Sequence, residues 1–449
     1  MLKETQMKRS HFAILFLYAI SFTIVQASST GTSSQPLLTA TRPQIVQDEQ
    51  SQKKWRKDLK ALVKALRKRH PNPFHGIPQA EFLAAVDSLD ARIATLTDSQ
   101  INRELIGLVA LISRNGRDGH TEYVPSQTGF HLLPFQLYRF SDGVFITDAR
   151  PPHEGLIGRQ VVAIGEHSIE DVVAAMTPYI AKDNDSTVKW HLPALLIIPE
   201  FLESFGFVAD PELVSLRLQS PNGEPETVTI SPVTIPEYAA WREFPSIKLP
   251  QTQDELYLSD SNDAFWSTFL ADSGTLYIRY NQIARKNNQG MKLALFVKKI
   301  KKELSAGIVQ RLVIDLRQNN GGDSNTYGPL LTALRENTTI NQRGKLFAII
   351  NQGVFSAAIN FVTDLERQTN VLLVGEPTGG SPNHYGDSVP VVLPNFRGTL
   401  FVSTVYHQKS DANDPRLSIE PDIAIELSSS DYFAGRDAAL AAILNFTSQ

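Results

Sequence analysis

A single serine stands where an apolar strand is expected to give way to an apolar helix. The stretch AIINQGVFSAAINF covers residues 348–361, and Ser356 lies at the junction. Serine is a preferred N-cap residue, so Ser356 can serve simply to cap the helix. The free N–H groups and dipole of a helix N-terminus also stabilise negative charge, which suits a nucleophile there. The spacing differs from the G-x-S-x-G turn of α/β-hydrolases, so this stretch alone leaves both interpretations open.

Two other stretches contain residue types suited to chemistry. In DLRQNNGGD (315–323), an expected strand ends at Asp315 and continues into a loop that contains Gly321 and Gly322. The backbone N–H groups of these glycines can approach a ligand closely. The alternative is a plain turn, and no lysine follows as in a phosphate-binding P-loop. GRDGHT (116–121) places His120 in a glycine-flanked loop after an expected helix. A lone loop histidine carries little meaning, so its role depends on the other two stretches.

Taken in order, the motifs resemble those of the S41 family of tail-specific and tricorn-like serine peptidases. The motifs are DGHT, LVIDLRQNNGGD, GVFSAA, LLVGEPTGG and IEPDI, and the resemblance covers essentially the whole chain after its N-terminal leader. It implies that Ser356 is the nucleophile. It also implies an oxyanion hole formed by the N–H of Ala357 and that of Gly321 or Gly322. Two such donors suit a tetrahedral intermediate, because losing one costs roughly 10²–10³ in rate.

The resemblance implies a histidine base and an acid. Tail-specific members use a lysine in the segment matching GEPTGGSPN, where this chain has Ser381. The tricorn-like branch uses an N-terminal histidine that matches His120, and a histidine with a pKa near 6.5 can accept the serine proton. His384 and His407 are alternative bases.

The acid that orients the histidine is expected in NDPRLSIEPDI, residues 413–423. We expect Asp414, with Glu420 as the alternative acid. The chain has no cysteine and no H-E-x-x-H motif, which disfavours a zinc peptidase. No metal and no other cofactor is expected.

The pattern of apolar residues predicts an α/β fold in three parts. Residues 48–125 are expected to form a helical domain, in which Trp55, Leu59, Leu62 and Leu66 share one face of the first helix. Residues 130–235 contain short strands and resemble a PDZ-like β-rich module. From 236 to 449, buried strands alternate with helices, which predicts a largely parallel sheet. The S41 resemblance implies that this part is a ClpP/crotonase-like catalytic core.

The N-terminus has the features of an export signal. Basic residues precede FAILFLYAISFTIV, and Val25-Gln26-Ala27 is typical of a cleavage site, so residues 1–27 are expected to be a signal peptide. An uncleaved anchor is the alternative. Residues 28–47 are expected to be a disordered leader. The absence of cysteine in an exported chain favours a bacterial periplasmic or extracellular protein.

These observations predict a secreted serine-type peptidase whose partner is a polypeptide substrate. The net charge of −4 over 449 residues gives no basic footprint for nucleic acid. No membrane span is expected after signal cleavage. Two alternatives remain: a non-catalytic ligand- or peptide-binding protein on the same fold, and a hydrolase of small esters or amides. The sequence gives no indication of oligomeric state or cleavage preference.

Overall fold

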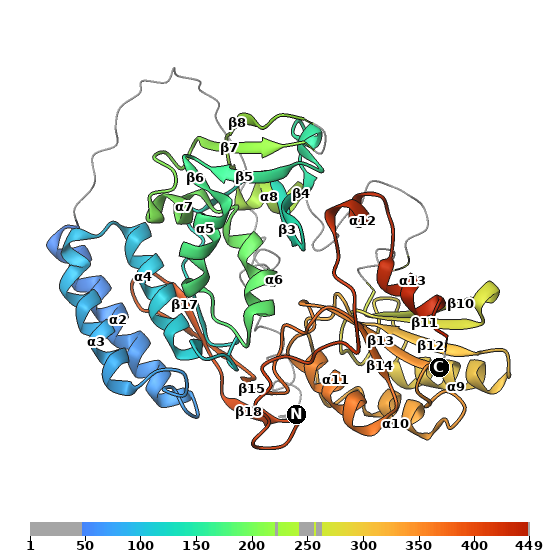
Figure 1. Ribbon diagram of the computed structural model, residues 1–449. Coiled ribbons are helices and arrows are strands. Elements are labelled where there is room, and N and C mark those ends of the chain that lie inside the picture. The colour runs from blue at the N-terminus through green and yellow to red at the C-terminus, as the bar shows by residue number, and fades with distance from the viewer. Residues whose placement is uncertain (1–46, 221–222, 242–255, 257–262, 448–449) are drawn as a thin grey trace.

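The computed structural model describes residues 47–220, 223–241, 256 and 263–447 (Figure 1). The expected signal peptide, 1–27, lies outside the described residues, as does the leader except for residue 47. Within the described ranges, no helix is both long enough and apolar enough to cross a bilayer.

The N-terminal block is helical, as predicted. Its helices are α2 (Glu49–Arg69), α3 (Gln79–Arg92) and α4 (Asp98–Ala110). Helix α2 buries the predicted face of Trp55, Leu59, Leu62 and Leu66. Helix α4 begins at a capping box, in which the Thr97 hydroxyl accepts from the Gln100 N–H and the Gln100 side chain accepts from the Thr97 N–H. Helical periodicity thus accounts for the buried face of α2, and cap chemistry for the start of α4.

The middle of the chain forms an antiparallel sheet with the strand order β3-β4-β5-β7-β8, and β6 pairs with β5. The short strands predicted for residues 130–235 are present, and helices lie among them. The PDZ-like character of the module stays a prediction. Its strands and helices are β3 (Phe135–Phe140), β4 (Gly143–Ala149), β5 (Gln160–Ile164), β6 (His167–Ser168), α5 (Ile169–Met176), α6 (Asp185–Leu195), α7 (Pro199–Phe205), β7 (Val214–Gln219) and β8 (Glu226–Ile230). Beside them lie the pair β2 (His131–Leu132) and β9 (Val233–Thr234) and the helix α8 (Ile235–Trp241).

The C-terminal half contains a six-stranded sheet in the order β10-β11-β12-β13-β14-β19. Within this sheet, β11, β12, β13, β14 and β19 run parallel, as predicted, and only β10 is antiparallel to its neighbour. The strands are β10 (Phe265–Leu270), β11 (Thr275–Tyr280), β12 (Arg311–Asp315), β13 (Leu346–Ile350), β14 (Leu372–Gly375) and β19 (Ile423–Ala424).

Both faces of this sheet are covered, because alternate residues of each strand point to opposite sides. One face packs on α9 (Leu293–Ser305), α10 (Gly328–Glu336) and α11 (Ala357–Gln368). The other packs on α13 (Ala438–Leu444), which follows the short helix α12 (Ser429–Phe433). The carboxyl ends of β12 and β13 meet at one edge of the sheet, where ligands bind in parallel α/β folds.

The expected boundary at residue 236 does not separate the molecule into contiguous blocks. Strand β1 (Glu122–Val124), at the end of the helical block, pairs antiparallel with β17 (Thr399–Val402), which also pairs with β16 (Val389–Val392). The Asp58 carboxylate of α2 also accepts hydrogen bonds from the backbone of Asn395 and Phe396, at 3.0 and 2.9 Å. Strands β15 (Asn383–Gly386) and β18 (Val405–Gln408) form a two-stranded antiparallel sheet, placed between the helical block and the parallel sheet (Figure 1).

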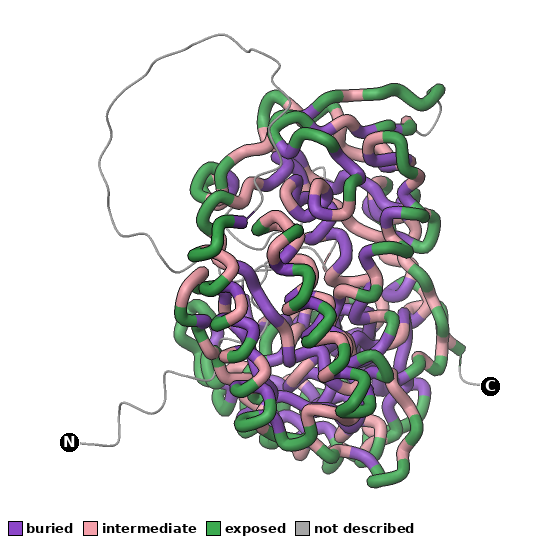
Figure 2. The backbone as a smooth tube through the Cα atoms, turned by 90° about the vertical axis from the view of Figure 1, so that its left-hand side faces the viewer, coloured by how far each residue is buried: buried purple, intermediate pink, exposed green. Residues whose placement is uncertain are grey.

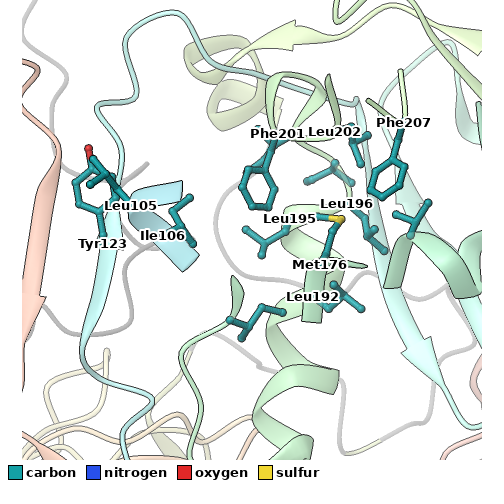
Figure 3. Packing of buried hydrophobic residues seen from close by; sticks show 14 of the residues in the cluster. Leu105, Ile106, Tyr123, Met176, Leu192, Leu195, Leu196, Phe201, Leu202 and Phe207 are labelled. Carbon is teal, nitrogen blue, oxygen red and sulfur yellow. The ribbon is translucent and has the colours of Figure 1, made fainter. Parts of the chain in front are cut away.

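One apolar core joins the helical block to the middle module. Figure 3 shows Leu105 and Ile106 of α4 near α6 and α7, whose Leu192 and Phe201 belong to the same buried cluster. The cluster also includes Leu400 of β17. Buried residues follow the inner segments of the chain and exposed residues the outer ones (Figure 2). The helical block, the middle module and β17 are therefore held together by continuous packing.

We expect Trp55→Ala to lower the free energy of unfolding by about 3–5 kcal/mol, the usual cost of emptying a large aromatic site. The Trp55 ring stacks on that of Phe396, with centroids 3.8 Å apart, and its Nε1–H donates to Asp98 at 2.7 Å. Trp55→Phe is the control, because it keeps an aromatic ring against Phe396 and loses only the hydrogen bond and part of the buried volume, so its cost should be smaller. Urea unfolding measures both variants; a loss below about 1 kcal/mol for Trp55→Ala would contradict this packing.

Candidate active site

Ser356 lies between β13 and α11 in a strained backbone conformation, with φ of 53° and ψ of −125°. Its side chain makes no capping hydrogen bond to α11, and its Oγ has no hydrogen-bond partner among the described residues. Positive φ in a residue with a Cβ costs about 1–3 kcal/mol and is found mainly at functional sites. Ser356 thus occupies the N-cap position of α11, but its side chain makes no capping hydrogen bond, which leaves the hydroxyl available.

The glycine loop after β12 lies against this serine. At Gly321, with φ of +120°, an added Cβ would lie 2.7 Å from the Ser356 Cβ and 3.0 Å from the Ala357 nitrogen. The Gly321 N–H is already used, because it donates to the Asn319 side chain at 3.0 Å. By contrast, the N–H groups of Gly322 and Ala357 have no hydrogen-bond partner among the described residues. Of the two glycines expected at an oxyanion hole, Gly322 is therefore the one whose backbone N–H has no partner among the described residues.

Asn319 fixes the glycine loop relative to the segment that carries Ser356. Its Nδ2 donates to the Tyr280 carbonyl at 2.7 Å, and its own carbonyl accepts from the Phe355 N–H at 3.3 Å. The side chain is fully buried. This asparagine therefore ties β11, the glycine loop and the residue before Ser356 together.

The charged residues of DLRQNNGGD are structural. Asp315 forms buried ion pairs with Arg279 at 2.8 Å and with Arg317 at 2.6 Å, and Arg317 also pairs with Asp437 at the start of α13. Burial opposes ionisation, but the two guanidinium groups outweigh it and hold the pKa of Asp315 below its usual range. The carboxylate is thus part of the support below the glycine loop.

His120 is buried, with 1% of its surface exposed, and its ring stacks on that of Phe355 with centroids 4.4 Å apart. Neither ring nitrogen has a hydrogen-bond partner in the described part of the chain, so no bond joins it to Ser356. Burial lowers its pKa to about 4, which keeps the imidazole neutral at neutral pH. His191 of α6 approaches the same Phe355 ring from its edge, at 6.4 Å. The structure therefore places the predicted base beside the residue that precedes the predicted nucleophile.

The loop that carries His120 is held by the buried carboxylate of Asp118. Oδ2 accepts from the His70 Nε2–H at 2.8 Å, and Oδ1 accepts from the Ser403 hydroxyl at 2.7 Å and the Thr121 N–H at 3.1 Å. Burial alone would raise the pKa of Asp118, but these hydrogen bonds, led by that of His70, lower it. Asp118 belongs to the quoted GRDGHT motif, yet the motif gave no sign that its partners come from α2 and β17.

His70, His75 and Asp118 also form a group whose ligand atoms lie within 4.8 Å of one another, close enough to suggest a cation site. The proton position on His70 argues against that interpretation. Its Nδ1 accepts from the Asn72 N–H at 3.0 Å, so its proton must sit on Nε2 and point at Asp118. A protonated Nε2 cannot ligate a metal, so the contact between His70 and Asp118 is a hydrogen bond; the His75 Nε2, 3.7 Å from the same carboxylate, has no hydrogen-bond partner among the described residues.

A second buried carboxylate, Asp183, connects the histidine loop to the segment after β14. It accepts from the Gly119 N–H at 2.7 Å and from the Ser381 N–H at 2.9 Å. Burial raises its pKa to about 7. No local pattern in the sequence indicates a role for Asp183, because its partners are backbone groups of distant segments. Ser381, at the position of the missing lysine, donates its hydroxyl to the Leu417 carbonyl at 2.6 Å.

Neither expected acid contacts the His120 imidazole. Asp414 accepts from the Arg416 guanidinium, with Nε 3.1 Å from Oδ1, and from the Ser410 hydroxyl. Glu420 is exposed and accepts from the Ser418 hydroxyl at 2.6 Å. The expected hydrogen bond between a carboxylate and His120 is therefore absent from the described residues, because both acids are directed toward partners in their own segment.

We expect Asp118→Asn to lower the free energy of unfolding by about 1–3 kcal/mol. The amide NH₂ cannot accept, so the donor from His70 or the one from Ser403 loses its buried partner. Ser403→Ala is the control, since it removes a donor and leaves the carboxylate intact, and its loss should be smaller. Chemical unfolding checks the order; equal stability of Asp118→Asn and the wild type would show that this support is unimportant.

Comparison with known proteins bears on the fold. No protein-family model and no curated protein sequence matches the chain. Among solved structures, mature CPAF in complex with lactacystin aligns with a TM-score of 0.61 at 14% identity, over 88% of this chain and 99% of CPAF. A serine-to-alanine variant of CPAF aligns with a TM-score of 0.60 at 12% identity, over 89% and 99%. Since CPAF is an S41-family serine peptidase, this chain has the fold of that family, as its motifs predicted.

Proposed function

We propose that this chain is an exported serine peptidase that cleaves polypeptides through an acyl-enzyme on Ser356. The observation that carries the proposal is the state of this serine. Its hydroxyl is uncapped on a strained junction, with the unpaired N–H groups of Ala357 and Gly322 in the adjoining segments. Strain of this kind persists only where surrounding structure enforces it, and it suits a preorganised nucleophile. The fold shared with CPAF supports the same reaction class.

In the first half of the reaction, the Ser356 Oγ attacks the scissile carbonyl carbon while its proton passes to His120. The carbonyl π electrons move onto oxygen, and the two N–H groups stabilise that oxyanion. Collapse of the tetrahedral intermediate breaks the C–N bond. His120 returns the proton to the leaving amine nitrogen, so the released peptide is neutral at that step and Ser356 carries the acyl group.

In the second half, water attacks the acyl carbon and gives up a proton to His120. The second intermediate expels the Ser356 oxygen, which recovers its proton from the imidazolium, and the products are a carboxylic acid and free enzyme. His120 is suited to this exchange because burial keeps it neutral. Catalytic hydrogen bonds are often long before substrate binds, so the missing bond between His120 and Ser356 is compatible with this role.

A second candidate function is ligand binding without catalysis. It is favoured by the unconnected Ser356 and His120 side chains and by an apolar cavity between β1, the end of α6 and α8. The cavity is lined mainly by apolar side chains, among them Val124, Phe130, Leu132, Ile197 and Tyr238. A binding protein needs such a cavity and no activated serine, so one experiment separates the two candidates.

We expect the purified chain to react covalently with a fluorophosphonate probe at Ser356. Ser356→Ala should abolish labelling, and His120→Ala should slow it by about 10²–10⁴-fold, the usual contribution of a general base. Intact-mass spectrometry with peptide mapping identifies the modified residue. An unlabelled but folded wild type would favour the binding protein. A labelled protein that hydrolyses small esters but no polypeptide would favour the small-molecule hydrolase.

We expect the labelling rate to fall on acidification with a midpoint near pH 4, and not near pH 6.5. Because burial lowers the pKa of His120 to about 4, the imidazole stays mostly neutral at pH 5. For a histidine with a pKa near 6.5, the neutral fraction of the imidazole would fall roughly thirtyfold by pH 5. Labelling rates between pH 5 and 8 test this, with circular dichroism confirming the fold at each pH. A thirtyfold fall by pH 5 in folded protein would show an ordinary pKa for the base.

A further inference from the structure

The glycine loop that supplies one candidate oxyanion donor is bonded to the nucleophile segment on both of its sides. Upstream of Gly322, the Asn319 carbonyl accepts from the Phe355 N–H at 3.3 Å. Downstream, the Ser324 hydroxyl accepts from the Asn360 Nδ2–H at 3.0 Å. Gly322 itself is exposed and its N–H is unpaired among the described residues, so the direction of that N–H depends on how its neighbours are held.

The loop and the start of α10 run along one face of α11. Three residues of this segment, spaced three apart, contact three residues of α11 and its N-cap that are spaced four apart. The pairs are Gly321 with Ser356, Ser324 with Asn360, and Tyr327 with Asp364. Residues four apart lie on the same face of a helix, which explains this register. Among the three pairs, the hydrogen bond nearest to Gly322 in the sequence is that of Asn360.

Stability alone does not explain an asparagine at position 360. The side chain is only 2% exposed within the buried face of α11, where asparagine is a weaker helix former than leucine. Its Oδ1 is buried and has no hydrogen-bond partner in the described part of the chain. A buried oxygen without a partner costs free energy that an apolar side chain would avoid. The bond from Nδ2 to Ser324 is therefore the feature that indicates a role for this residue.

We infer that Asn360 is the positioning residue of the candidate oxyanion hole. Its backbone N–H donates to the Ser356 carbonyl at 3.3 Å, and its side chain reaches the residue two positions after Gly322. Asn360 is thus bonded to both segments that supply a donor, and it keeps the Gly322 N–H in place relative to the Ala357 N–H. Two donors stabilise an oxyanion only if both are directed at the same oxygen. This inference rests on the proposed function.

Two substitutions remove the hydrogen bond from opposite ends. Asn360→Leu replaces the amide by an apolar side chain with as many heavy atoms, and the half-buried Ser324 hydroxyl can then bond to water. Ser324→Ala removes the acceptor and leaves α11 unchanged. We expect each to lower the rate constant for fluorophosphonate labelling of Ser356 by about ten- to hundredfold, less than the roughly 10²–10³ lost with a whole donor. The double variant should lose no more than Asn360→Leu alone, because both changes break the same bond.

Tyr327→Phe is the matched control, because it removes the next hydrogen bond along the same helix face, the one to Asp364. It should lower stability and leave the labelling rate within about twofold of the wild type. In Asn360→Leu, we expect the midpoint of thermal unfolding to equal or exceed that of the wild type, since an unpaired buried oxygen is removed.

A purely structural role for Asn360 predicts instead that the midpoint and the labelling rate fall together. An Asn360→Leu rate within about twofold of the wild type, or an equal loss of rate in Tyr327→Phe, would overturn the inference.

Hydrogen exchange tests the inference even if the proposed function fails. The Asp323 N–H, between Gly322 and Ser324, donates to the Ile283 carbonyl at 2.8 Å, so its exchange rate reports how firmly the loop is held. We expect faster exchange at Asp323 in Asn360→Leu than in the wild type, measured by mass spectrometry of short peptides. Unchanged exchange would overturn the inference. A folded wild type that is not labelled would overturn the proposed peptidase, while faster exchange in the variant would leave the contact between α11 and the glycine loop standing.

Discussion

The hydrogen bonds of one buried carboxylate, that of Asp118, determine where the candidate base lies. Its donors come from the end of α2, the end of β17 and its own loop, which are far apart in the sequence. A charge buried in this way is tolerated only when its oxygens are satisfied, so these three elements can pack only in an arrangement that meets at Asp118. His120 follows two residues later and is carried to the Phe355 ring by that arrangement.

The candidate nucleophile, Ser356, depends on a different support. The positive φ of Ser356 is unfavourable in isolation, and three features hold it: the buried Asn319, the close approach of Gly321, and the ion-paired Asp315 and Arg317 below the loop. These groups belong to the parallel sheet, whereas the support of His120 belongs to the helical block and β17. Asp183 and the stack on Phe355 join the two halves.

Much of the fold could be predicted from the sequence because it depends on local patterns. The buried face of α2, the capping box of α4 and strand β11 all follow from residue spacing within one element. The junction at Ser356 follows from the same periodicity.

What the sequence did not reveal depends on long-range contacts. Nothing near Asp183 indicates that it will accept from Gly119 and Ser381, and nothing near β1 indicates its pairing with β17. The acid illustrates the same limit. Asp414 matched a motif by position, but its neighbours Ser410 and Arg416 satisfy its oxygens locally, and no sequence distance shows that. The proton position on His70 likewise follows only from hydrogen bonds seen in three dimensions.

The pairing of β1 with β17 has a consequence for the order of events during synthesis. Chains emerge N-terminus first, at about 5–20 residues per second. Residues 122–124 therefore cannot pair until residues 399–401 have been synthesised. The hydrogen bond from the Ser403 hydroxyl to Asp118 can form only later still. A nascent chain that already contains Ser356 still lacks the finished support of His120. The approach of these two candidate residues is thus coupled to the synthesis of β17 and Ser403, and a chain truncated before β17 keeps both residues while losing the scaffold that brings them together.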